Sequence, residues 1–217
     1  MPSATRLRRR LVRHHVPLGL ASAAAVCLFY AIVDSKGTMF RWSMATAYVG
    51  FALLGASLAL GPLNILRHRP NPVSTDLRRD VGIWGGILSV VHFLVGWQVH
   101  MKHRYLYWLR EIDGTERLTV RLDAFGFANY TGLAAVVAVV LLLALSNDVA
   151  LRRLGTARWK TLQRWNYPLF ALVLVHAAAY QVIENRHVPY VLLFAAMLLP
   201  ILLLQAAGFR AQRAARA

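Results

Sequence analysis

Long runs of apolar residues are the feature that most restricts how this chain can fold. Hydrophobic residues make up 58% of its 217 positions, and they gather in segments of about 20 residues, which is the length a helix needs to cross the hydrocarbon core of a bilayer. Six membrane-spanning helices are predicted, at 16–33, 43–66, 81–101, 124–146, 167–184 and 188–208. The sequence therefore predicts an all-α integral membrane protein, a six-helix bundle in contact with the lipid bilayer. Pro62 is expected to end or kink the second helix.

The charged residues lie between these segments and indicate how the bundle is oriented. Lys and Arg number 25 and Asp and Glu 9. If the helices alternate in direction, 17 of the 25 basic residues fall on one side, in the two tails and in two loops. Because basic loops face the cytoplasm, both termini are predicted cytoplasmic, with basic tails at 1–15 and 209–217 around a membrane domain at 16–208. We interpret this charge as a topology signal and expect no nucleic-acid partner.

The sequence contains little that would support other kinds of chemistry. The first apolar run follows a basic stretch, as in a signal peptide, but its length favours an uncleaved helix. Cys27 is the only cysteine, so one chain can form neither a disulfide nor a thiolate metal site. The connecting segments, including 102–123 and 147–166, are expected to be polar loops. Since no Gly-rich nucleotide motif is present, flavin or nicotinamide chemistry would have to come from a partner.

Two of the predicted helices each contain one histidine deep in an apolar segment. His92 lies 11 residues into the third helix and His176 lies 9 residues into the fifth. The two helices run in the same direction, so at about 1.5 Å per residue the imidazoles differ in depth by only a few ångströms. Ionisable residues inside a membrane are costly and usually mark a functional site. The pair therefore predicts a shared ligand.

The residues around the pair leave two interpretations open. Gly85, Ser89 and Gly96 share a helix face with His92, where small side chains leave room for a porphyrin but also suit close helix packing. Tyr180 shares a face with His176. Zinc normally takes three or four ligands, whereas haem iron can be held by two histidines. We therefore expect one haem b on His92 and His176; the alternative is a pair of histidines that only hydrogen-bond neighbouring helices.

The remaining histidines are expected to lie outside this centre. His103 and His187 each follow one of the pair by 11 residues, an offset that allows a second, outer haem, although interfacial positions are the favoured interpretation. His100 points partly away from the face of His92 and is expected to be solvated. His14 and His15 are expected to belong to a solvated basic tail.

Three sequence segments resemble the ferric-reductase-like transmembrane haem domains, and most of all the MsrQ-type haem-binding subunits of the bacterial periplasmic methionine sulfoxide reductase system. These segments are LALGPL at 58–63, LRRDVGIW at 77–84, and LSNDVALRRLGTARWKTLQRWNYPLFALVLVH at 145–176. The resemblance implies a ferric-reductase-like core at about 43–208 in a bacterial inner membrane. It also implies electron transfer from a cytoplasmic flavin reductase carrying FMN, or from quinol, to a periplasmic oxidoreductase or an external acceptor.

Two positions depart from that family. Gln163 stands where the family typically has a histidine, thirteen residues before the one that matches His176, and Arg79 stands thirteen residues before His92. Because glutamine is a poor iron ligand, these departures argue against an additional inner haem of the family's kind. We expect an electron-transfer subunit of an oxidoreductase system. The alternatives are a self-sufficient ferric or quinone reductase and a haem-free membrane scaffold or transporter.

Overall fold

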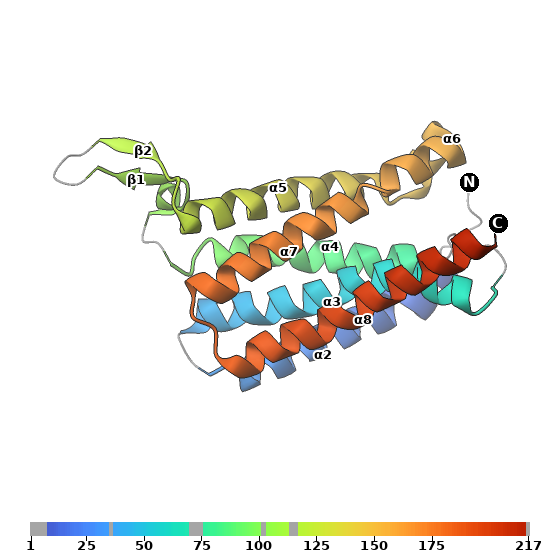
Figure 1. The fold of residues 1–217 in the computed structure, drawn as a ribbon, viewed down its shortest axis with the longest axis horizontal. Coiled ribbons are helices and arrows are strands. Elements are labelled where there is room, and N and C mark those ends of the chain that lie inside the picture. The colour runs from blue at the N-terminus through green and yellow to red at the C-terminus, as the bar shows by residue number, and fades with distance from the viewer. Residues whose placement is uncertain (1–7, 35–36, 70–75, 101–102, 113–116, 216–217) are drawn as a thin grey trace.

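A computed structural model describes residues 8–34, 37–69, 76–100, 103–112 and 117–215. Six of its helices are long and apolar enough to cross a membrane, which confirms the predicted six-span, all-α architecture. The helices are α2 (Val16–Ile32, preceded by a π-helical turn, Leu11–His15), α3 (Thr38–Leu66), α4 (Asp76–Gly96), α5 (Ala124–Leu145), α7 (Asn166–Ile183) and α8 (Val188–Ala214). They run side by side, and α2 begins at the end of the bundle where α8 finishes (Figure 1).

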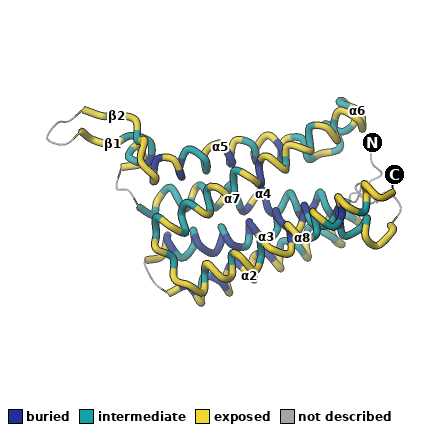
Figure 2. Tube along the Cα trace, in the orientation of Figure 1, coloured by how far each residue is buried: buried dark blue, intermediate teal, exposed yellow. Residues whose placement is uncertain are grey.

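Helix α3 is at the centre of the packing and contacts α2, α4 and α8, while α5 packs mainly against α7. Small residues permit the close approach of α3 and α4: a Cβ added to Gly85 would lie 2.9 Å from the backbone nitrogen of Leu54. Buried residues follow α3, and the outer faces of the bundle are exposed (Figure 2). Those outer faces carry many large apolar side chains, such as Leu192 and Leu203 on α8. The protein is thus built as a multi-pass membrane protein whose apolar surface suits lipid.

Pro62 does not end α3, which continues to Leu66. A proline lacks the N–H that would bond the carbonyl four residues earlier, here that of Leu58. The side chain of Gln205 on α8 donates to this carbonyl instead, at 2.9 Å. Because a neighbouring helix satisfies the freed oxygen, the helix can continue through the proline inside the membrane.

Two segments expected to be polar loops contain regular structure. Residues 147–166 include α6 (Asp148–Gln163), which Asn147 caps by accepting from the backbone N–H of Ala150 at 2.8 Å. The indole N–H of Trp159 donates to Leu145 O at 2.8 Å and so fastens α6 to the end of α5. Residues 102–123 include a 3₁₀ turn (Arg104–Tyr107) and an antiparallel hairpin of β1 (Leu109–Glu111) and β2 (Leu118–Val120). The hairpin and α6 lie at opposite ends of the bundle (Figure 1).

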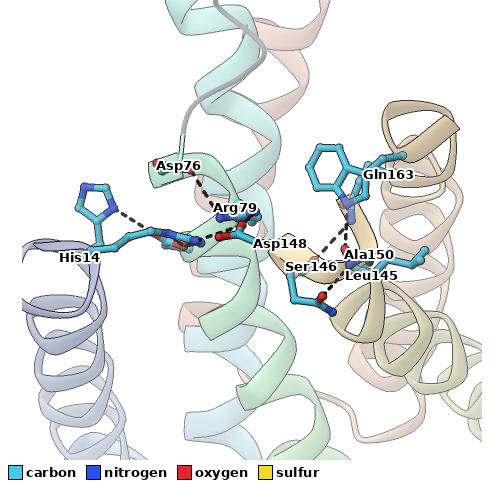
Figure 3. Close-up of polar contacts among 12 residues, drawn as sticks. His14, Asp76, Arg79, Leu145, Ser146, Asp148, Ala150 and Gln163 are labelled. Atoms are coloured by element: carbon cyan, nitrogen blue, oxygen red, sulfur yellow. Dashed lines mark hydrogen bonds and ion pairs between the residues drawn. The ribbon is translucent and has the colours of Figure 1, made fainter. Parts of the chain in front are cut away.

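Helix α4 covers 76–96 where the sequence predicted 81–101. It begins earlier because its first turns carry charged residues that find partners at the end of the bundle. Arg79 donates to Asp148 at the start of α6 at 2.8 Å and lies 3.5 Å from Asp76 (Figure 3). The same end holds α6 and the finish of α8, so the described parts of the segments predicted to be cytoplasmic lie at one end of the bundle (Figure 1).

An ionic cluster at this end corrects the expectation that His14 and His15 are solvated. Asp80 on α4 is fully buried, with 0% of its side chain exposed. The Nε of Arg10 donates to both of its carboxylate oxygens at 3.0 Å, His14 Nδ1 lies 2.7 Å from Oδ2 (Figure 3), and His15 Nε2 lies 3.3 Å from Oδ1. The beginning of the first span is therefore tied to α4 because a buried carboxylate requires charged partners.

Candidate functional site

The two histidines that the sequence singles out meet inside the bundle. His92 lies near the end of α4 and His176 in the second half of α7. Their ring centroids are 6.2 Å apart and the ring planes are inclined by 71°. The depth match read from the sequence thus corresponds to direct proximity in space.

The His92 ring is fixed by the beginning of α3. Its Nδ1 lies 3.0 Å from the backbone carbonyl of Ser43 and 3.4 Å from the Ser43 hydroxyl. A carbonyl can only accept a hydrogen bond, so Nδ1 carries the proton that is shared with it. The ring is therefore held in one orientation, with Nε2 on its other side.

The His176 ring is fixed in the same way by α5. Its Nδ1 donates to the backbone carbonyl of Ala128 at 2.8 Å. The ring also lies directly against Gly132, where an added Cβ would be 2.7 Å from both Cε1 and Nδ1 of His176. Glycine is thus the residue that lets α5 approach the imidazole closely enough for this hydrogen bond.

This arrangement leaves the two Nε2 atoms available as ligands. In a neutral imidazole whose Nδ1 donates a proton, Nε2 carries a free lone pair. Metal-binding histidines almost always donate their other N–H to a carbonyl or carboxylate, which fixes the ring and raises its basicity. Within the residues the structure describes, neither Nε2 makes a hydrogen bond. Both side chains are therefore oriented as metal ligands usually are.

The spacing of the rings also fits coordination of one metal atom. An imidazole nitrogen binds a metal at about 2.0–2.1 Å and lies about 1.2 Å from its ring centre, so two imidazoles on opposite sides of one metal have centroids about 6.4 Å apart. The observed separation is 6.2 Å. Among the described residues, no group of three or more His, Cys, Asp or Glu side chains could hold a metal ion. A centre that needs only two protein ligands, such as haem iron, fits the pair.

Both imidazoles line a cavity of about 180 Å³ that is otherwise mainly apolar. An engineered cavity of about 150 Å³ binds one benzene ring, so a porphyrin, which contains four pyrrole rings, would require side chains of the lining to move apart. Of the residues predicted to surround the ligand, Ser89, Gly96 and Tyr180 line the cavity. Gly85 lies elsewhere, in the contact with Leu54 of α3, where it serves helix packing.

The outer part of the cavity carries a polar group that sequence reasoning missed. His100 was expected to be solvated, but it lines the cavity, stacks on Tyr180 with ring centroids 6.0 Å apart and has its Nδ1 3.3 Å from Oε1 of Glu184. The Tyr180 hydroxyl donates to Asn129 Oδ1 at 2.8 Å, and its ring centroid is 5.0 Å from that of His176. Since α4 ends at Gly96, His100 does not follow the helical direction assumed for it. Asn129, a polar residue in an apolar span, was the sequence signal that could have indicated this polar part of the cavity.

The other predicted positions lie away from this centre. His103 is exposed and stacks on Tyr105 with ring centroids 5.6 Å apart, and His187 is exposed at the beginning of α8. The two positions where an inner haem ligand was considered have other contacts. Gln163 lies 3.4 Å from the Ser146 hydroxyl (Figure 3), and Arg79 is paired with Asp148.

The contact between Gly132 and His176 leads to a stability prediction. Gly132→Ala is expected to displace the imidazole, to strain its hydrogen bond with Ala128, and to destabilise the protein by about 1–3 kcal/mol, as overpacking usually does. The midpoint of thermal unfolding in detergent would measure it. Gly82→Ala on α4 is the control, because its added Cβ would meet Ser57 at an ordinary 3.6 Å. Equal stability of both variants would show that the His176 ring is not closely seated.

Comparisons with protein-family models, with curated proteins and with solved structures found no match for this chain. The cavity and the two imidazoles fixed in its lining are therefore the features from which a function is inferred.

Proposed function

We propose that this chain is the haem-binding membrane subunit of an electron-transfer system, with one haem b held between α4 and α7 by His92 and His176. The observation that carries the proposal is the pair of imidazoles, 6.2 Å apart on one cavity, each fixed through Nδ1 to a backbone carbonyl. Bound there, haem would supply a centre that accepts and releases one electron at a time.

The protein's own residues would hold and tune that centre. The carbonyls of Ser43 and Ala128 keep both Nδ1 atoms protonated and both Nε2 atoms free, so the rings need little rearrangement to bind iron. The aliphatic and aromatic lining, which includes Leu54, Val139 and Phe194, excludes water and lowers the local dielectric. Burial of this kind is one of the means by which a protein sets the reduction potential of a haem.

The ends of the bundle suggest the direction of electron transfer. The end with α6 carries most of the basic residues, so we assign it to the cytoplasm of a bacterial inner membrane. A cytoplasmic flavin reductase or quinol would donate there. The cavity lies nearer the end with the β1–β2 hairpin, where a periplasmic oxidoreductase or another external acceptor would take the electrons. This assignment agrees with the resemblance to MsrQ-type subunits.

A second candidate, a haem-free scaffold, has one observation in its favour. The hydrogen bond of His92 joins α4 to α3, and that of His176 joins α7 to α5, as expected of histidines that only connect helices. It leaves unexplained why both histidines line one cavity. We therefore rank it below the cytochrome.

Haem content distinguishes the candidates. Protein expressed with haem supplied and purified in detergent is expected to show a low-spin b-type spectrum that sharpens on reduction with dithionite, with about one haem per chain. About two haems would bring His103 and His187 back as ligands. Protein without haem would contradict the proposal and favour the scaffold. Reduction of a ferric chelate by the purified chain alone, without a partner, would instead indicate a self-sufficient reductase.

A further inference from the structure

Arg186 is one of the residues that line the same cavity. It lies in the short turn between α7 and α8, where Asn185 has a φ of 44° and the Arg186 backbone N–H donates to Gln181 O at 3.1 Å. The side chain is half-buried, and its guanidinium lies over the ring of Phe40, 4.8 Å from the centroid. Arginine stays protonated in proteins. The turn therefore fixes one positive charge beside a mainly apolar space.

This charge has no carboxylate at ion-pair distance among the residues that the structure describes. Glu184, two residues earlier, has its Oε1 3.3 Å from Nδ1 of His100. Burial lowers the pKa of Arg186, and the charge of Glu184 opposes that effect. A partly buried cation without an ion-pair partner is costly, so its surroundings favour an incoming anion.

Arg186 and the two histidines, His92 and His176, line one cavity. A ligand that satisfies all three groups needs a metal centre for the imidazoles and an acidic group at its edge for the guanidinium. Arginine binds carboxylates through two parallel hydrogen bonds, which fix orientation as well as adding affinity. Haem b has both features, because its periphery carries two propionates.

We propose that Arg186 anchors a propionate of the haem held by His92 and His176. The inference rests on the proposed function and adds to it the recognition of the carboxylate edge. Arg186 would thereby fix how the macrocycle is turned within the cavity, while the histidines fix its iron.

Haem and haem dimethyl ester test this directly, since esterification removes the carboxylate charge and leaves the iron and macrocycle unchanged. Wild-type protein purified without haem is expected to bind haem about 10- to 100-fold more tightly than the ester, as for a charge-assisted hydrogen bond. Arg186→Gln should lose most of that preference by binding haem more weakly, with little change for the ester. Titration followed by the rise of the low-spin absorbance gives both affinities.

Two further variants define the outcome. Arg186→Lys keeps the charge without the planar fork and should retain part of the preference. Arg104→Gln is the matched control, because Arg104 is exposed and lies over Trp97, 5.6 Å from its ring centroid, outside the cavity lining. It should keep the wild-type preference.

The reduction potential provides a second measurement. Loss of a positive charge near the iron favours the oxidised form, so the potential of bound haem is expected to be lower in Arg186→Gln than in wild type or Arg104→Gln. Wild-type preference for haem in Arg186→Gln would overturn the anchor, as would equal weakening of haem and ester. Failure of the wild-type protein to bind any haem would instead contradict the proposed function, and this is seen before any variant is made.

Discussion

Replacing either His92 or His176 with alanine is expected to abolish haem retention while leaving the protein in the membrane. Each imidazole would supply one of only two protein ligands. Removing a residue that only orients a metal ligand typically lowers metal affinity by roughly 10- to 100-fold, so loss of a ligand itself should lower haem affinity at least as much. Insertion depends on the apolar spans, and neither substitution changes their length or removes an apolar residue. Haem per chain in the purified variants and the amount of protein in the membrane fraction measure the two effects.

His100→Ala is the matched control for these variants. His100 lines the same cavity, but its Nδ1 already lies 3.3 Å from a carboxylate oxygen of Glu184, so its removal should leave most of the haem in place. Normal haem content in either the His92 or the His176 variant would show that the ligands are assigned wrongly. Loss of haem in all three variants would indicate that the cavity tolerates no histidine change, and ligation by the pair would not be established.

The six spans and the meeting of the two histidines could be predicted because both depend on quantities that run along a single helix. Length and hydropathy decide whether a segment can cross a bilayer, and the constant rise of a helix converts a position in sequence into a depth. The predicted limits of α4 were wrong mainly because of the charged residues at its beginning. Their partners come from α6 and from the first span, and a hydropathy pattern does not contain that information.

The parts of the site that were not predictable depend on contacts between helices. The groups that orient His92 and His176 are backbone carbonyls of Ser43 and Ala128. Every residue has a carbonyl, so only the rotation and register of the packed helices decide which ones are used. The close approach of Gly132 to His176 has the same origin. His100 enters the cavity because α4 ends at Gly96, which a continuous apolar run did not reveal.

Asp80→Asn is expected to destabilise the protein by about 3–5 kcal/mol, the usual cost of removing one partner of a buried ion pair. The side chain of Asp80 is fully buried and accepts from Arg10, while His14 and His15 lie at 2.7 and 3.3 Å. The amide would leave Arg10, whose side chain is only 13% exposed, without its main counter-charge. The first span should separate from α4 as a result, and the unfolding midpoint in detergent should fall.

Asp76→Asn controls for the same chemical change on the same helix. The side chain of Asp76 is 39% exposed and lies 3.5 Å from Arg79, so its loss should cost about 0–1 kcal/mol, as for a surface ion pair. Pairing Asp80→Asn with Arg10→Gln completes a double-mutant cycle. If the buried pair is what joins the two helices, the double variant should be more stable than the sum of the single losses predicts. Additive losses, or equal effects of Asp76→Asn and Asp80→Asn, would mean that apolar packing alone holds the first span against α4.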